Sequence, residues 1–463
     1  MKGLIYFGYS LLISCVAVSG LNYANYRKFL IEQSKNETFV KLFNEHSKRF
    51  QKAPFEAKLT FPCKADSNRP KKATNVHELT PYDVKVIGAV GDSITAGTGI
   101  RAKTIIGLLI EDRGLSWSGG GDGNVEEYIT LANMLKVYNP SLVGFATGTG
   151  DYCKENAHLN VANPGDEASN MPYQARLLVE RLKSGKEGVD FQNDWKIITM
   201  FIGGNDLCSY CDDKDFYSVE NYIGYIREAL DILHSEVPKA FVNLVEVLNI
   251  GVLPSLNEGL ICEAIHFFGC RCGGYPENKD ELQAYVQAYQ KGVEDLVNSG
   301  RYDTRDDFTV VDQPFFAETH VPTLSDGSPD LSYFSPDCFH LSEKGHESAA
   351  YALWDNMIEP VGHKRRSWSP GVPVECPTSE APYFYTKKNS PPAKQSFDKK
   401  ELTQDGGNNH SNGVSGTTVA VIIIGMMCLI GIVSGLVYYS KRKRSNEENE
   451  GILKQQHSSY NQI

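Results

Sequence analysis

The stretch VKVIGAVGDSITAGTG, residues 84–99, sets the fold that we expect for this chain of 463 residues. Its first seven residues form a mostly apolar run, a pattern typical of a buried β-strand. Ser93 follows the strand and precedes a turn of small residues, so its hydroxyl group can face a ligand, and Gly91 and Gly97 let the backbone bend there. The alternative is that Asp92 or Ser93 only caps the following helix.

Similar apolar runs alternate with amphipathic runs along the middle of the chain. The predicted strands cover residues 195–202, 240–248 and 308–311, and the predicted helices cover residues 171–182, 219–237, 281–297 and 346–358. Strands that alternate with helices imply βαβ units, and therefore an α/β fold with a mostly parallel sheet covered on both faces. Ligands of such sheets bind outside the carboxyl ends of the strands, where the polar motifs of this chain lie.

The motif DCFH, residues 337–340, could supply a base for the serine. A serine hydroxyl is a poor nucleophile at neutral pH without a base, and histidine titrates in the right range. Asp337 lies three residues before His340, so one turn of chain can bring its carboxylate to the imidazole. The alternative is a surface aspartate beside a structural histidine.

Two more motifs, GGND at 203–206 and LNVANPG at 159–165, offer hydrogen-bond donors. Asn205 carries a side-chain amide, and Gly165 a backbone N–H, that could stabilise negative charge on a carbonyl oxygen. Taken alone, GGND is better explained as a turn built from glycine and asparagine, and LNVANPG is a weak signal.

Together and in this order, the four motifs resemble the blocks of the GDSL, or SGNH, hydrolase family. The longer segments EDRGLSWSGGGD (111–122), YNPSLVGFATGTG (138–150) and DCFHLSEKGHESAAYALWDNMIEP (337–360) are similar to the phospholipase B group within it. The resemblance covers about residues 83–360. It implies a three-layer α/β/α sandwich of flavodoxin-like type, no cofactor and no metal, and attack by serine on a carboxylic ester.

The resemblance also implies roles for the motif residues. Ser93 is the expected nucleophile and His340 the general base. The N–H groups of Ser93 and Gly165, with the Asn205 side chain, form the expected oxyanion site. The glycine block departs from the family pattern, since Asn163-Pro164 replaces the small residues that usually precede the glycine.

Two aspartates are candidates for the third member of the triad. The spacing favours Asp337, which lies within reach of His340. In phospholipase B-like proteins the aspartate of GGND, which is Asp206 here, has also been put forward, so both residues stay open at this point.

The function that we expect is a membrane-anchored serine esterase of phospholipids and lysophospholipids. Alternatives on the same site are an acylglycerol, a retinyl ester or an acetylated sugar as substrate. A non-catalytic cell-surface receptor and a metal-dependent hydrolase are further alternatives. The formal net charge of −11 argues against a nucleic-acid partner, which would need a basic face.

The two ends of the chain predict a single-pass type I protein of the plasma membrane, at the apical or another cell surface. Residues 1–20 read as a signal peptide, and residues 417–439 form an uncharged stretch long enough to span a bilayer, followed by the basic cluster 441–444. The remaining expected parts are an extracellular segment (21–80, with a possible helix at 29–43), the hydrolase domain (81–362), a stalk (363–416) and a cytoplasmic tail (440–463).

The expected extracellular compartment determines the state that we expect for the cysteines. Nine lie between the signal peptide and the span, and in an oxidising space they can form up to four disulfides. Zinc binding by Cys208-x-x-Cys211 and Cys270-x-Cys272 is the alternative. The sequons at Asn36 and Asn409 are permitted sites for glycans.

Overall fold

The computed structural model describes residues 21–51, 59–67, 69–256, 259–274, 279–318, 320–368 and 372–392. The expected signal peptide, transmembrane span and cytoplasmic tail lie outside these residues, as does the expected stalk beyond residue 392. None of the helices in the described part has both the length and the apolar character that a membrane span needs.

Four parallel strands form the sheet of the domain. They pair in the order β1 (Val84–Gly91), β2 (Trp195–Phe201), β3 (Ala240–Val245) and β4 (Phe308–Gln313). Nearly every residue in them is buried, as expected for a parallel sheet covered on both faces. The predicted α/β fold with a parallel sheet is therefore confirmed.

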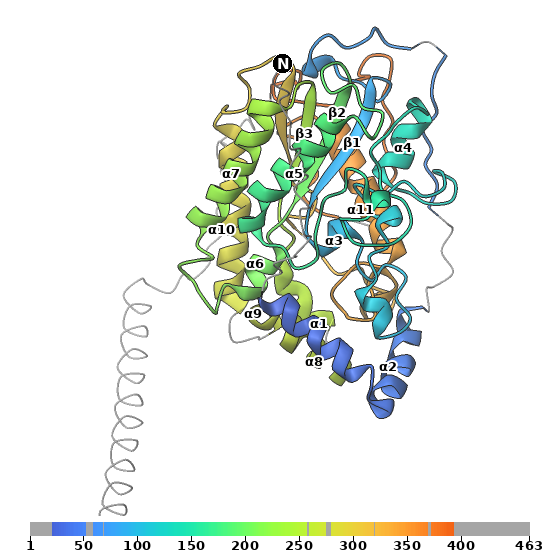
Figure 1. Cartoon of the computed structure of the whole chain (residues 1–463), viewed down its shortest axis with the longest axis vertical. Helices are drawn as coiled ribbons and strands as arrows, with labels where there is room; N and C mark the ends of the chain where they lie inside the picture. The colour runs from blue at the N-terminus through green and yellow to red at the C-terminus, as the bar shows by residue number, and fades with distance from the viewer. Residues whose placement is uncertain are drawn as a thin grey trace, which may run out of the picture. The chain divides into compact units, whose positions relative to one another are not determined.

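Helices cover both faces of this sheet (Figure 1). One side carries α5 (Met171–Ser184), α7 (Val219–Glu236) and α10 (Lys279–Asn298), and the other carries α4 (Leu131–Tyr138) and α11 (Glu343–Ile358). Two of the long helices, α7 and α11, start at a serine whose hydroxyl group caps them: the side chains of Ser218 and Ser342 accept the N–H groups of Asn221 and Gly345. The predicted helices agree with these elements to within a few residues at their ends.

Shorter elements lie mainly near the carboxyl ends of the strands. The short helices are α3 (Ser93–Ala96), α6 (Gly204–Ser209), α8 (Leu260–Gly269) and α9 (Arg271–Gly274). The 3-10 turns are η1 (Val76–Glu78), η2 (Ile106–Leu109), η3 (Arg113–Leu115), η4 (Glu155–Ala157), η5 (Ala168–Asn170), η6 (Ile250–Leu256) and η8 (Leu331–Tyr333).

The N-terminal segment forms two helices, α1 (Leu21–Gln33) and α2 (Glu37–Phe50). The single helix expected at 29–43 is wrong, because Asn36 interrupts it. Asn36 has an extended backbone conformation, and its side-chain oxygen accepts the N–H of Phe39 at 3.1 Å, so it caps α2. Tyr26, Leu30 and Phe43 of these helices belong to a small hydrophobic cluster apart from the main core.

The beginning of the expected stalk packs onto the domain instead of standing free. Trp368 and Phe384 are buried, and the Phe384 N–H donates to the Leu79 carbonyl at 2.9 Å. A disulfide also joins Cys376 to Cys63. The sequence did not predict these attachments. The segment is rich in proline and serine, and isolated anchor residues create no periodic pattern.

Four disulfides are present among the described residues: Cys63–Cys376, Cys208–Cys270, Cys211–Cys272 and Cys262–Cys338. The cysteines for which zinc was the alternative are thus paired with one another. The prediction of a disulfide-bonded domain is confirmed.

Replacing Phe384 tests whether residues 372–392 are part of the folded domain. The Phe384→Ala variant should lose about 3–5 kcal/mol of unfolding free energy, because it removes a fully buried aromatic ring. Val372→Ala, on the same segment but 40% exposed, should lose less than about 1 kcal/mol. Urea unfolding of both variants measures the difference, and equal losses would contradict the packing described here.

Candidate active site

A serine, a histidine and an aspartate meet at the carboxyl edge of the sheet. Ser93 is the first residue of α3, directly after β1, and its Oγ lies 2.7 Å from Nε2 of His340. The other ring nitrogen, Nδ1, lies 2.5 Å from Oδ2 of Asp337. All three side chains are buried. This order of contacts is the one that transfers a proton from a serine hydroxyl to an imidazole held by a carboxylate.

Asp337 is held in its charged form by its surroundings. Its Oδ1 accepts the backbone N–H groups of Phe339 (3.1 Å) and His340 (2.9 Å), and its Oδ2 accepts the hydroxyl of Tyr26 at 2.9 Å. Burial alone would raise the pKa of Asp337, but the charge of His340 and these hydrogen bonds lower it to about 2. The carboxylate can therefore orient the imidazole and stabilise an imidazolium.

Asp206 has a different environment. Both of its carboxylate oxygens lie 3.1 Å from the backbone N–H of Ala168, and the His340 ring is bonded to Asp337 instead. Burial, and then the neighbouring Glu167, raises the pKa of Asp206 well above its ordinary value. The structure thus brings Asp337, and not Asp206, to the histidine.

Asn205 shares a pocket with Ser93 and His340. Its Nδ2 donates to the carbonyl of Asp166 at 2.8 Å, and this bond uses one of the two amide hydrogens. The side chain is thereby fixed at the first turn of α6. An amide held in this way can act as an oxyanion donor.

Gly165, the third expected oxyanion donor, lies outside the lining of the pocket that holds Ser93. Its φ of +82° is a conformation that favours glycine, and a Cβ there would lie 2.5 Å from Cβ of Tyr23. Glycine is therefore required at this position so that α1 can pack against the loop. Gly165 does not line the pocket of Ser93, and the role of its N–H as an oxyanion donor stays a prediction.

The strand end before the serine is fixed by contacts that the sequence did not reveal. The Gln174 amide of α5 accepts the N–H of Gly91 and donates to its carbonyl, both at 2.8 Å. Asp92 accepts the N–H of Ile94 at 2.9 Å and so caps α3. The capping alternative considered for this motif therefore holds for Asp92, while Ser93 faces His340.

The loop that carries Asp337 and His340 is fixed by residues from helices outside the motifs. His46 of α2 lies 2.9 Å from the carbonyl of Pro336, and His266 of α8 lies 3.0 Å from that of Cys338. Cys338 is also bonded to Cys262 of α8. No local pattern marks these histidines, because the segments that they join are far apart in sequence.

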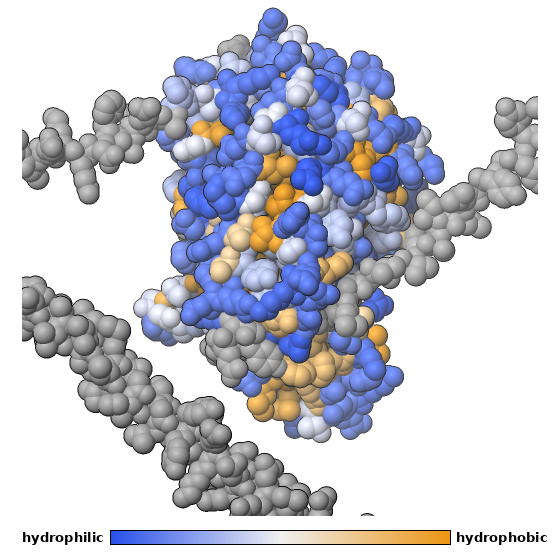
Figure 2. Space-filling view, turned by 90° about the vertical axis from the view of Figure 1, so that its left-hand side faces the viewer, coloured by the Kyte–Doolittle hydropathy of each residue, from blue (hydrophilic) through white to orange (hydrophobic). Residues whose placement is uncertain are grey.

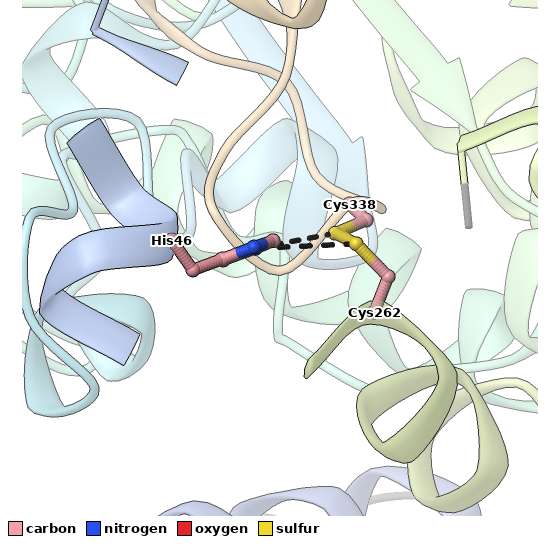
Figure 3. A group of neighbouring side chains, drawn as sticks. All are labelled: His46, Cys262 and Cys338. Carbon is pink, nitrogen blue, oxygen red and sulfur yellow. Dashed lines mark hydrogen bonds between the residues drawn. A yellow bond between two sulfur atoms is a disulfide. The ribbon is translucent and has the colours of Figure 1, made fainter. Parts of the chain in front are cut away.

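The group His46, Cys262 and Cys338 has the spacing of a metal site (Figure 3). Nε2 of His46 lies 3.6 Å from the sulfur of Cys338 and 3.9 Å from that of Cys262. The two sulfur atoms are bonded to each other, however, and a metal needs free thiolates as ligands. The oxidised group is therefore a structural contact beside the triad.

The comparison with known proteins agrees with this geometry. The family model of the GDSL-like lipases and acylhydrolases matches residues 87–353, more than half of the chain, and the chain therefore belongs to this family. The expected family membership is confirmed.

Curated relatives are similar over most of this chain. Membrane-associated phospholipase B1 is 47% identical in Mus musculus and 41% identical in Homo sapiens, over 72% and 71% of this chain. The chain spans 23% of the length of each relative.

Among solved structures, an acetylxylan esterase from Geobacillus stearothermophilus aligns with 59% of this chain and 93% of its own. Its identity of 16% and TM-score of 0.28 are too low to support an argument.

Substituting each aspartate separates the two candidates for the triad acid. Asp337→Asn should lower kcat by about 10⁴, because the amide would favour the wrong imidazole tautomer. Asp206→Asn should lower kcat far less, since its side-chain oxygen can still accept the Ala168 N–H. Steady-state hydrolysis of a water-soluble ester measures both. A larger loss in the Asp206 variant would assign the role to Asp206.

The buried carboxyl groups near the site predict how stability changes with pH. Burial raises the pKa of Asp92 to about 6 and that of Asp166 to about 7, and it raises the pKa of Asp206 as well. The unfolded chain loses these protons near pH 4, whereas the folded protein keeps each one until the pH passes its raised pKa. Raising the pH from 4 therefore lowers the unfolding free energy, up to about pH 6 for Asp92 and about pH 7 for Asp166. Asp337 has the opposite effect because its pKa is lowered. Its ionised carboxylate stabilises the folded protein fully above pH 4, and this stabilisation is lost as the pH falls through about 2.

We therefore expect Asp206→Asn to flatten this dependence. Urea unfolding between pH 5 and pH 8 should show a smaller loss of stability in the variant than in the wild type. An unchanged or steeper slope would mean that Asp206 is already ionised in the folded protein.

Proposed function

We propose that the chain is a serine esterase that hydrolyses the carboxylic ester bonds of phospholipids and lysophospholipids, with acylglycerols as further substrates. The observation that carries the proposal is the buried series of contacts from Ser93 through His340 to Asp337. The family supports an acylhydrolase, and the relatives named phospholipase B1 support the substrate class.

The mechanism assigns one task to each group. His340 takes the proton of Ser93 through Nε2, Oγ attacks the ester carbonyl, and Asp337 stabilises the imidazolium. The Asn205 amide, with the N–H groups of Ser93 and Gly165, holds the oxyanion. His340 then protonates the leaving alcohol and activates the water that releases the fatty acid.

We further propose that the enzyme is a single-pass type I protein of the plasma membrane, with the catalytic domain outside the cell. The uncharged stretch 417–439 with the basic cluster after it, the signal-like residues 1–20 and the four disulfides support this topology. The folded domain includes residues of the expected stalk up to 392.

The decisive experiment removes the nucleophile. The purified full chain should release fatty acid from phosphatidylcholine, and Ser93→Ala should lower the rate by at least about 10⁴. A fluorophosphonate probe should label the wild type and fail to label this variant. Ser348→Ala, a buried serine on α11 whose hydroxyl bonds only the Lys344 carbonyl among the described contacts, should keep both activity and labelling. Fatty acid release by Ser93→Ala at the wild-type rate would refute the proposal.

A further inference from the structure

The large apolar side chains exposed on the described part of the molecule are concentrated on a few elements. Six of the nine lie on α1, on α2, on η2 with the residue after it, and on α8: Ile31, Leu42, Ile106, Ile110, Leu260 and Phe267. We call these four elements the apolar end of the domain. In Figure 1, α1, α2 and α8 lie together at the lower end of the domain, and Figure 2 shows apolar residues grouped there.

This surface is unusual for a domain whose remaining exterior is mostly polar. Leu260 is 81% exposed and Phe267 is 51% exposed, and both lie on α8. Apolar area left in water costs about 25 cal/mol per Å², so a cluster of such side chains indicates a partner that covers them. Beneath them lies the separate hydrophobic cluster that includes Leu30, Phe43 and Ile261.

Two of these elements, α1 and α8, form one wall of the pocket in front of the nucleophile. Tyr23 and Tyr26 of α1, and Ile265 and His266 of α8, line it together with Ser93. The pocket has a volume of about 20 Å³, enough for one water molecule, whereas ligand pockets usually hold about 300 Å³ or more. An acyl chain needs more room than this, so side chains that line the pocket have to move before it can reach Ser93. Because α1 and α8 supply part of that lining, a ligand bound at the apolar end lies next to the substrate path.

The charge of the N-terminal helices points to the partner. Residues 21–51 contain six basic and three acidic side chains, a net charge of +3 in a chain whose total is −11. All six basic residues are exposed: Arg27, Lys28, Lys35, Lys41, Lys48 and Arg49. Apolar side chains flanked by lysine and arginine are the combination that binds a bilayer interface containing anionic lipids.

We propose that the apolar end is the surface by which the catalytic domain docks on a phospholipid bilayer, so that a lipid passes from the bilayer between α1 and α8 to Ser93. This inference rests on the proposed function, and it adds the place and the orientation of contact. Leu260 and Phe267 enter the acyl region, and the basic residues of α1 and α2 meet the headgroups.

Fluorescence quenching tests the contact without relying on activity. All four native tryptophans are at most 3% exposed, so a tryptophan introduced on the surface reports its own surroundings. The full chain is reconstituted into vesicles of phosphatidylcholine and phosphatidylserine with brominated acyl chains. Leu260→Trp should be quenched at least twofold more strongly than Tyr173→Trp, a control at a residue that is exposed on α5. Equal quenching at the two positions would overturn the proposal.

Activity supplies a second test. The double variant Leu260→Ser, Phe267→Ser should hydrolyse vesicle phospholipid at least tenfold more slowly than the wild type, and a water-soluble short-chain ester within twofold of it. The control pair Tyr173→Ser, Phe216→Ser, also exposed but on none of the four elements of the apolar end, should change neither rate. The proposal is wrong if the double variant loses both activities in equal proportion, or if the control pair loses as much vesicle activity.

The two tests also separate this proposal from the proposed function. A wild type that hydrolyses the soluble ester and no phospholipid would refute the substrate class, while the quenching result would still decide whether the apolar end meets lipid. Conversely, full phospholipid hydrolysis without preferential quenching of Leu260→Trp would retain the proposed function and refute the docking surface.

Discussion

Parallel pairing of the four strands is the constraint on which the rest of the domain depends. Because each strand has to return to the same starting edge, its connection crosses over a face of the sheet, and all four strands end at one edge. Ser93 follows β1 and Asn205 follows β2, so the nucleophile and an amide donor reach the same place by topology alone. The alternating apolar and amphipathic runs of the sequence are the direct cause of this arrangement.

His340 and Asp337 depend on a different kind of support. Their loop lies between β4 and α11 and has no regular hydrogen-bond ladder along most of its length. It is fixed instead by the hydroxyl of Tyr26, by His46 and His266 on its carbonyl groups, and by the bond to Cys262. The N-terminal helices and α8 therefore position catalytic groups, although the family pattern is centred on the α/β core.

The parts of this molecule that the sequence predicted are those with a local signature. Buried strands have continuous apolar runs, and the approach of Asp337 to His340 follows from a spacing of three residues. Tyr26 is 311 residues from Asp337 and His46 is 290 from Pro336, so no pattern along the chain could join them. The break at Asn36 and the packing of Phe384 escaped prediction for a related reason: one cap or one buried ring creates no periodicity. Whether Gly165 serves as an oxyanion donor stays a prediction.

The disulfide between Cys63 and Cys376 has a mechanical consequence for the folded domain. Residues 377–392 are attached by the buried Phe384 ring and by separate hydrogen bonds, such as those from the Tyr385 N–H to the Met357 carbonyl and from the Asn389 amide to the His77 carbonyl. A pull between the two ends of the described chain would load residues 377–392 and the N-terminal helices α1 and α2, and then the sulfur–sulfur bond. The backbone of residues 64–375, with the whole sheet and the three catalytic side chains, lies outside the covalent path that carries the tension. The sheet can thus stay folded while the two ends of the described chain are pulled apart.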